Sequence, residues 1–202
     1  SEWQAFAVPA DSEFETVADL ADAMRADPGA VAFAGGAAGS LDHVTVGLFA
    51  EAIGVDPTQI NYVAHSGGGE VAVAVMGGHL PVGVSGVSEF EQNAAAGQMR
   101  ILAVLSEEPV EGVDAPTLIS EGIDLSVGNW RSIHGAPGLS EDDQAALTAA
   151  LSAMVQTDAW QAVLEEKNWT GSYLDGEAFD SFMADEWERT RETLVAIGLL
   201  EQ

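Results

Sequence analysis

Two glycine-rich turns, each between a short apolar run and a helix-like run, most strongly limit how this chain folds. The first covers residues 33–43 (FAGGAAGSLDH) and the second residues 62–70 (YVAHSGGGE). Glycine permits a tight turn and close approach of backbone to a ligand, and the first N–H groups of a following helix lack an intrahelical partner. Such corners favour anions. Because neither turn contains Lys, Arg or Cys, both suit holding a small anion better than reacting with it.

The alternation of strand and helix continues along the chain and predicts an α/β fold. Strands joined through helices are typical of a parallel sheet that is covered on both faces. Ligands in such folds bind at the carboxyl ends of the strands, where both glycine turns fall. The predicted strands cover residues 5–8, 31–34, 60–63, 80–84 and 100–105, and three of the predicted helices cover 40–53, 70–76 and 89–96.

A further helix is predicted between the first two strands. Thr16, followed three residues later by Asp19, resembles a capping box that opens this helix, and Pro28 ends it. The apolar residues recur at helical spacing, so one stripe of the helix is expected to face the core. That stripe consists of Val17, Leu20, Ala21 and Met24.

After residue 106 the pattern changes. Residues 107–116 predict a surface loop, and a strand-like segment over 125–133 leads into a wholly helical region. Ser140, followed by three acidic residues, and Thr157 are predicted helix caps, and Gly176 precedes a last helix. The residues expected to be buried in the helix after Ser140 are Leu147, Leu151 and Met154.

The acidic balance of the chain excludes several classes of partner. Thirty-three acidic residues against six basic ones give a formal charge of −27, and Lys167 is the single lysine. Nucleic acid and anionic membrane surfaces are therefore poor partners. Two interpretations of the charge stay open, a solvation device for high salt and a cation-binding role. No stretch approaches the ~20 apolar residues needed to span a bilayer.

Several polar residues near the turns allow a functional and a structural interpretation. Ser40 either contacts a ligand or serves as an ordinary helix N-cap, and His43 either orients a carboxylate or packs against Tyr62. His65 and Ser66 are adjacent in sequence, and adjacent side chains rarely align as a nucleophile and its base. The histidine spacing does not favour a transition-metal site, and neither a P-loop nor a dinucleotide fingerprint is present.

Six ordered motifs resemble those of the extracytoplasmic solute receptors of tripartite tricarboxylate transporters. The resemblance covers nearly the whole chain. It rests on GGAAGSLDH at 35–43, NYVAHSGGGEVA at 61–72, GGHLPV at 77–82, AGQMRILAV at 96–104, PTLISEG at 116–122 and WRSIHGAPG at 130–138.

The resemblance implies a periplasmic-binding-protein architecture of the type II-like class. It contains one complete parallel-sheet domain plus the C-terminal helices of a partial first domain. Residues 1–8 are expected to be a crossover strand from the first domain, residues 9–126 the ligand-binding α/β domain, and residues 127–202 the return strand and helices of the first domain. Family chains normally begin with a further strand and glycine-rich loop, so the N-terminal part of that domain is expected to be absent here.

The resemblance also implies a set of ligand-contacting positions. Three departures from the family pattern, at His65, Pro81 and Ser85, mean that ligand selectivity is not carried over. The implied ligand-binding residues are Ala37, Ala38, Gly39, Ser40, His43, Ser66, Gly67, Gly68 and Ser85.

The function implied is a non-enzymatic receptor that captures a mono-, di- or tricarboxylate outside the cytoplasmic membrane, in the periplasm or attached to the cell surface. It would deliver the anion to membrane permease subunits, and no cofactor, metal or catalytic residue is expected. A homodimer is one further expectation. Two alternatives stay open: an α/β hydrolase-like or phosphotransfer enzyme that uses Ser40 or Ser66, and a sensor or scaffold with a degenerate cleft.

Overall fold

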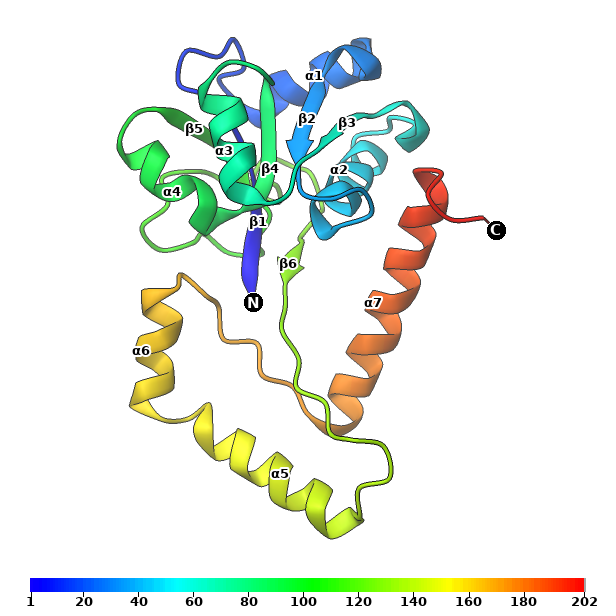
Figure 1. The fold of residues 1–202 in the computed structure, drawn as a ribbon. Helices are drawn as coiled ribbons and strands as arrows, with labels where there is room; N and C mark the ends of the chain where they lie inside the picture. The colour runs from blue at the N-terminus through cyan, green and yellow to red at the C-terminus, as the bar shows by residue number, and fades with distance from the viewer. Residues whose placement is uncertain (202) are drawn as a thin grey trace.

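A computed structural model describes residues 1–201, and strands and helices alternate in it up to residue 104 (Figure 1). The strands are β1 (Glu2–Pro9), β2 (Ala32–Gly35), β3 (Asn61–Ala64), β4 (Val82–Gly86), β5 (Met99–Val104) and β6 (Gly128–Asn129). The helices are α1 (Val17–Ala26), α2 (Leu41–Ala52), α3 (Gly68–Met76), α4 (Val87–Ala95), α5 (Glu141–Met154), α6 (Asp158–Glu166) and α7 (Gly176–Ala196).

The sheet is mixed, with five strands in the order β3-β2-β4-β1-β5 and β6 paired to the start of β1. β2 pairs in parallel with β3 and β4, whereas β1 runs antiparallel to both β4 and β5. The prediction of a parallel sheet is therefore correct for four strands and wrong for β1. The connection from β1 to β2 has a loop before α1 and a 3₁₀ turn after it. A connection of this kind can join either parallel or antiparallel strands, so the sequence does not specify the direction of β1.

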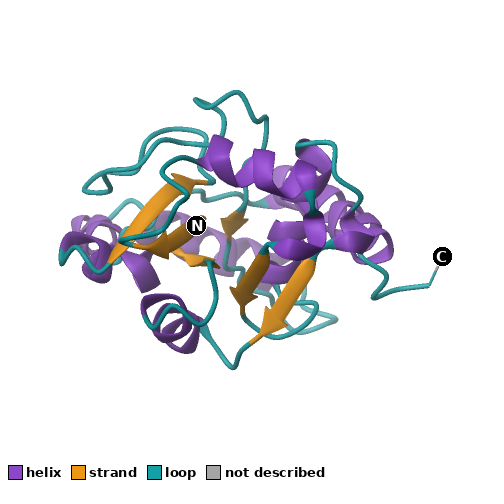
Figure 2. Cartoon of the chain, turned by 90° about the horizontal axis from the view of Figure 1, so that it is seen from above, coloured by secondary structure: helices purple, strands orange, loops and turns teal. Residues whose placement is uncertain are grey.

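Helices cover both faces of the sheet, as the sequence predicts (Figure 2). Alternate residues of β1 point to opposite faces, because side chains in a strand alternate. Phe6 and Val8 join the core that α1 and α2 cover, and Ala5 and Ala7 join the core under α3 and α4. Aromatic packing fills the first core, with the ring centroid of Phe6 lying 4.8 Å from that of Phe49.

The local capping predictions are confirmed. Thr16 and Asp19 form a capping box at the start of α1, and all four residues of the predicted apolar stripe are buried. The Ser140 side chain accepts the N–H of Asp143 at the start of α5, and Thr157 accepts the N–H of Trp160 at the start of α6. These caps depend on residues three positions apart, so the sequence alone is enough to specify them.

The region after residue 125 differs from the prediction in two ways. Within the strand-like segment over 125–133, only the two residues of β6 pair in the sheet. The predicted buried stripe of α5 is wrong, since Leu147 is 51% exposed and Met154 38% exposed. α5 and α6 lie well away from the sheet (Figure 1), so no neighbouring surface within residues 1–201 buries that stripe.

The last helix, α7, returns to the α/β body and packs on α2. Its Thr193 is buried, and a Cβ atom added to Gly47 of α2 would lie 2.7 Å from Cγ2 of Ile197. Further along α7, Arg189 donates to the carbonyl oxygen of Ser126 and pairs with Glu186, which accepts the Trp130 indole N–H. These contacts fix α7 to the chain on both sides of β6.

The charge of −27 is spread over the structure with few counter-charges. Five of the six basic side chains lie within 4 Å of a carboxylate, and the sixth, Arg100, donates to the carbonyl oxygens of Phe14 and Ala10. Five acidic side chains take part in these pairs, so in the described chain most of the 33 have no basic side chain within 4 Å. In the described part of the chain, no helix has both the length and the apolar character needed to cross a membrane.

Added salt is expected to stabilise the protein, because unpaired like charges repel one another in the folded state. The Debye length falls from about 30 Å at 0.01 M to about 3 Å at 1 M salt. We expect Tm to rise by about 4 °C or more over this range, measured by circular dichroism, which corresponds to more than about 1 kcal/mol. Sucrose, which does not screen charge, is the control; an unchanged or lower Tm in salt would contradict this account.

Gly47→Ala is expected to lower the free energy of unfolding by about 1–3 kcal/mol, because the new methyl group overpacks the contact between α2 and α7. Gly69→Ala in α3 is the matched control, since a Cβ atom there meets nothing within 4 Å. The control is expected to be neutral or stabilising by up to about 1 kcal/mol. Urea unfolding measures both, and equal effects of the two substitutions would show that Gly47 is not a packing constraint.

Candidate ligand-binding site

A pocket of about 440 Å³ lies at the carboxyl ends of β2 and β4, at the edge predicted from the alternation of strands and helices. β1 also contributes, because its antiparallel direction pairs Gln4 with Gly86, the last residue of β4. We call this the edge pocket. Its lining residues are Glu2, Gln4, Gly36, Ala37, Ser40, Leu41, Asp42, Ser66, Ser85, Gly86, Glu89, Asn129 and Arg131.

The first glycine turn is held in place by the helix that follows it. Gly36 donates its N–H to Oδ2 of Asp42 at 2.8 Å, and its carbonyl oxygen accepts the Tyr62 hydroxyl at 2.8 Å. Gly39 donates its N–H to Nδ1 of His43 at 3.2 Å. The His43 and Tyr62 rings stack with centroids 4.0 Å apart, so the packing interpretation of His43 is confirmed.

Two glycines of this turn are required by geometry. A Cβ atom at Gly35 would overlap the Tyr62 hydroxyl group, which needs that space to reach Gly36. Gly39 has a φ of +80°, a left-handed conformation that other residues rarely adopt. Burial raises the pKa of Tyr62, so the phenol stays protonated and remains a donor to the turn.

Ser40 is the residue at which the two sequence interpretations separate. It occupies the N-cap position of α2, but its side chain makes no cap hydrogen bond, so the N-cap interpretation is wrong for the hydroxyl. Within residues 1–201 the Ser40 Oγ atom is buried and has no hydrogen-bond partner by geometry, since the Tyr62 hydroxyl, whose pKa burial raises and Ser40 lowers, donates to the Gly36 carbonyl oxygen instead. A buried polar group without a partner costs about 1–3 kcal/mol. A ligand oxygen in the edge pocket would satisfy it.

Of the other ligand-binding residues that the resemblance implies, some line the pocket and the rest lie outside the lining. Besides Ser40, the lining includes Ala37, Ser66 and Ser85, whereas Ala38 and Gly67 are outside it. Gly39 and His43 are outside the lining and shape the first turn instead. Gly68 is also outside the lining, and a Cβ atom there would lie 2.8 Å from Oγ of the lining residue Ser85. Ligand contact by all nine residues stays a prediction.

Several lining residues were not predicted from the sequence. Asp42 and Glu89 lie in the first turns of α2 and α4, where acids complement the helix dipole, and that position is a signal that could have found them. Glu2 and Gln4 reach the pocket only because β1 runs antiparallel, which the sequence does not indicate. Arg131 lies in the chain after β6 and brings the single basic side chain of the lining.

The pocket is more acidic than a simple anion site. Glu2 is 9% exposed; it accepts the hydroxyl of Ser88 and has an oxygen 3.8 Å from Nη2 of Arg131. Burial, together with the nearby charges of Glu89 and Glu2, raises the pKa of Asp42. With its side-chain amide oriented to donate, Gln4 contacts Asp42 Oδ1 at 3.2 Å and the Ser85 carbonyl oxygen at 3.0 Å. Backbone N–H groups and hydroxyls therefore share this pocket with carboxylates.

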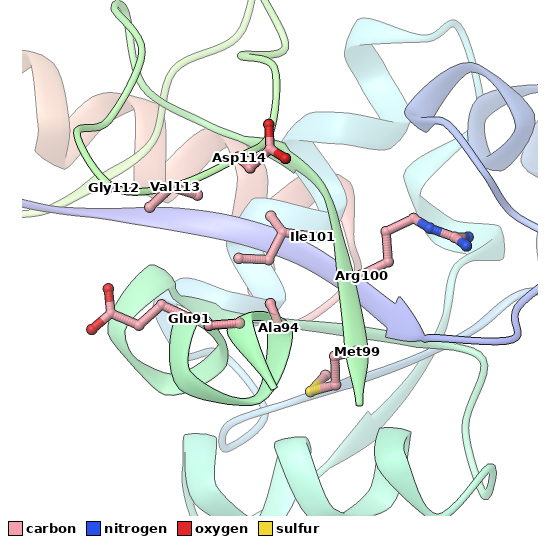
Figure 3. Close-up of a pocket in the computed structure, with 9 residues that line it drawn as sticks. Glu91, Ala94, Met99, Arg100, Ile101, Gly112, Val113 and Asp114 are labelled. Carbon is pink, nitrogen blue, oxygen red and sulfur yellow. The ribbon is translucent and has the colours of Figure 1, made fainter. Parts of the chain in front are cut away.

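A second hollow of about 350 Å³ lies between α4, β5 and residues 112–114 (Figure 3). Its charged side chains do not converge, because Glu91 and Arg100 point away from each other in this view. Glu91 accepts from Asn168, and Arg100 is committed to backbone carbonyl oxygens. The edge pocket is therefore the better candidate for ligand binding.

The features expected of a hydrolase are not assembled at either serine. Nδ1 of His65 lies 2.9 Å from the Val63 carbonyl oxygen, and in residues 1–201 no hydrogen bond joins the hydroxyl of Ser40 or Ser66 to a histidine. The Ser66 N–H donates to Glu70. The same residues contain no group of three His, Cys, Asp or Glu side chains that could hold a metal ion.

Comparison with known proteins agrees with this geometry. Residues 3–199 match the tripartite tricarboxylate transporter family receptor, and the chain belongs to that family. Protein BugT of Bordetella pertussis is 26% identical over 167 residues, which are 82% of this chain and 50% of that protein. The chain thus spans about half the length of this curated relative.

Solved structures share the fold over nearly the whole chain. A TctC solute-binding protein from Polaromonas, without ligand, is 26% identical with a TM-score of 0.78, covering 98% of this chain and 67% of that one. An R. palustris protein with adipate is 21% identical with a TM-score of 0.75, covering 98% and 66%. The mixed α/β architecture of a periplasmic binding protein is therefore shown for this chain.

Acid is expected to weaken the first turn through His43. Burial lowers the pKa of His43 below its ordinary value of 6.5, and its Nδ1 accepts from Gly39 only when unprotonated. The stability that His43 contributes is therefore complete above pH 6.5 and is lost as pH falls through the lowered pKa. We expect His43→Asn, which keeps an acceptor but cannot titrate, to remove a fall in the free energy of unfolding that the wild type shows as the pH is lowered from 6.5 through the depressed pKa of His43.

Urea unfolding at a series of pH values measures this difference between the wild type and the variant. His79→Asn is the control, because His79 is exposed in the turn after α3, and its profile is expected to follow that of the wild type. Identical pH profiles for His43→Asn and the wild type would contradict the role given to the His43 ring.

Proposed function

We propose that this protein is a receptor that binds a small organic carboxylate outside the cytoplasmic membrane. The observation that carries the proposal is the buried, unpartnered Oγ of Ser40, which lies within residues 1–201 at the N-terminus of α2 in the edge pocket. A ligand carboxylate would accept this hydroxyl together with free N–H groups at the start of the helix. Because the turn is already held by Asp42, His43 and Tyr62, little ordering would be needed on binding.

Membership of the receptor family supports the class of ligand and partner. Structures of the same fold from Rhodopseudomonas palustris contain adipate in one protein and malate in another. Their identities of 21% and 17% bear on the fold alone, so the identity of the ligand here is part of the proposal. The proposal also includes the partner: the receptor would deliver its carboxylate, from the periplasm or the cell surface, to the permease subunits of a tripartite tricarboxylate-type transporter.

The division of the chain into parts belongs to the same proposal. Residues 1–8 would be the crossover strand, residues 9–126 the ligand-binding domain, and residues 127–202 the return strand and helices of a second domain, with Gln202 outside the described residues. The exposed apolar residues of α5 and the separation of α5 and α6 from the sheet support this division. A homodimer through that apolar surface stays a prediction, and light scattering would test it.

The sensor or scaffold alternative predicts a cleft filled by side chains. The open volume of the edge pocket, about 440 Å³, supports the receptor instead. Ligand pockets for small molecules commonly have volumes of this order. No observation in the described residues favours the enzyme alternative over binding.

Isothermal titration calorimetry with a panel of mono-, di- and tricarboxylates tests the proposed function. The protein should be used as the cell produces it, in both low and high salt. At least one carboxylate is expected to bind with a single site per chain. The absence of heat with every carboxylate at both salt concentrations would overturn the proposal.

Ser40→Ala is expected to reduce the affinity for that carboxylate about tenfold or more, because a charge-assisted hydrogen bond is lost. Its free energy of unfolding should not fall and is expected to rise by up to about 1–3 kcal/mol, since the variant removes a buried hydroxyl that makes no hydrogen bond within residues 1–201. Ser181→Ala, at an exposed position of α7, is the control and should change neither quantity. Lost stability with unchanged affinity would instead assign Ser40 to the helix cap.

A further inference from the structure

One acid, Asp42, lies beside the hydroxyl that we assign to the ligand. A Cβ atom at Gly36 would lie 3.1 Å from Asp42 Oδ2 and 3.3 Å from Ser40 Oγ, so both oxygens border the same small space at the first glycine turn. All three residues line the edge pocket. A carboxylate that accepts the Ser40 hydroxyl therefore lies close to the carboxyl group of Asp42.

The Asp42 carboxyl group is held at this place by two hydrogen bonds. Its Oδ2 accepts the Gly36 N–H at 2.8 Å, and its Oδ1 accepts the Gln4 amide at 3.2 Å. Charges repel each other within a screening length of about 10 Å at 0.1 M salt. Two carboxylates that share a site do not both stay ionised readily, and one of them gains a proton more easily than it would alone. A bound carboxylate therefore favours a proton on Asp42.

The surroundings of Asp42 act in the same direction. Burial raises the pKa of Asp42, and the charges of Glu89 and Glu2 raise it further, although the hydrogen bonds from Gly36 and Gln4 lower it. In the part of the chain that the structure describes, Asp42 has no basic side chain within 4 Å. The charge of a ligand adds to a repulsion that is already present.

The other two acids of the lining are less suited to take the proton. The charge of Glu2 is met by Nη2 of Arg131 at 3.8 Å and by the hydroxyl of Ser88. Glu89 is exposed, so water solvates its charge. Asp42 alone combines a fixed position beside Ser40 with the absence of a nearby cation in the described chain.

We propose that the edge pocket takes up a proton from solvent when it binds a carboxylate, and that Asp42 receives this proton. The inference rests on the proposed receptor function and adds a pH dependence to it. A protonated Asp42 can still accept the Gly36 N–H, and its O–H becomes an additional donor. A pocket with one basic side chain in its lining thus gains a donor when an anion is present.

The sign of the pH dependence follows from the ligand charge. A negative ligand raises the pKa of Asp42 further, so the bound protein keeps the proton to a higher pH than the free protein. The affinity therefore rises as the pH falls through the higher, bound-state pKa, and it levels off below the free-state pKa.

The remaining charged groups around Asp42 do not produce the same effect. Protonation of His43 removes the acceptor of the Gly39 N–H and loosens the turn, which lowers the affinity in acid instead of raising it. Burial raises the pKa of Tyr62, and arginine keeps its charge in proteins. The titratable and charged groups that face Asp42 or share its pocket are His43 on α2, Tyr62 on β3, Glu2 on β1, Glu89 on α4 and Arg131 after β6.

Isothermal titration calorimetry on the protein as the cell produces it measures the proton uptake directly. The probes are propanoate, succinate, malate, adipate and citrate, each at pH 7.5, 6.5 and 5.5 in two cationic buffers of different ionisation enthalpy. Protonation of the free probe is subtracted. For a probe that binds, we expect uptake of about 0.3–1 proton per ligand at pH 5.5, with affinity rising about two- to tenfold per pH unit lowered.

Asp42→Asn assigns the proton to a residue. The amide keeps an oxygen that can accept the Gly36 N–H, but it carries no charge and does not titrate. The variant is expected to bind the same probe about threefold or more tighter at pH 7.5 and to lose the proton uptake. Asp42→Ser, which also removes the titrating group, provides a second variant, and circular dichroism checks that each variant is folded.

Asp11→Asn is the matched control. Asp11 is exposed and follows β1 at the end opposite Glu2, so this substitution makes the same change in net charge away from the pocket. It is expected to keep the proton uptake and the affinity of the wild type.

The outcomes separate this inference from the receptor function on which it rests. A carboxylate that binds the wild type without proton uptake, or more weakly at lower pH, removes the inference and leaves the receptor in place. Uptake that persists in both Asp42 variants, or that is lost in Asp11→Asn, also overturns the role of Asp42. No heat with any probe at any of the three pH values removes the receptor function and the inference together.

Discussion

The antiparallel pairing of β1 between β4 and β5 is the interaction on which the core and the pocket both depend. The middle residues of β1 pack into two hydrophobic cores, with Phe6 in the core on one face of the sheet and Ala7 in the core on the other. Its first residues, Glu2 and Gln4, lie at the carboxyl ends of the parallel strands. If β1 ran parallel to β4, Glu2 and Gln4 would lie at the opposite edge of the sheet. The pocket would then lose two of its lining residues.

The second constraint is the way in which α2 fixes the turn before it. A glycine turn by itself is flexible, yet Gly36 is held through both its N–H and its carbonyl group. The His43 ring, which stacks on Tyr62, accepts the Gly39 N–H. The Gly36 N–H and carbonyl groups and the Gly39 N–H are all hydrogen-bonded, whereas Ser40 Oγ has no partner in residues 1–201. Under the proposed function, this arrangement would let a pocket with few basic groups bind a carboxylate.

Local features of the fold could be predicted from the sequence, and features that depend on distant contacts could not. The capping box at Thr16 is specified by residues three positions apart, and it is present. Burial of Leu147 also looked predictable from helical spacing, but it requires a partner surface that residues 1–201 do not supply. The glycine turns located the pocket through Ser40, whereas Glu2 and Gln4 reach it through the direction of β1, which leaves no short-range signal.

A crystal structure of the protein, as the cell produces it, with a bound carboxylate tests the central claim most directly. This account predicts a ligand oxygen within about 3 Å of Ser40 Oγ at the N-terminus of α2, the ordinary distance of a hydrogen bond. The first turn is expected to keep its contacts with Asp42 and Tyr62. A ligand bound in the hollow between α4 and β5, or one in the edge pocket that leaves Ser40 without a partner, would contradict the account.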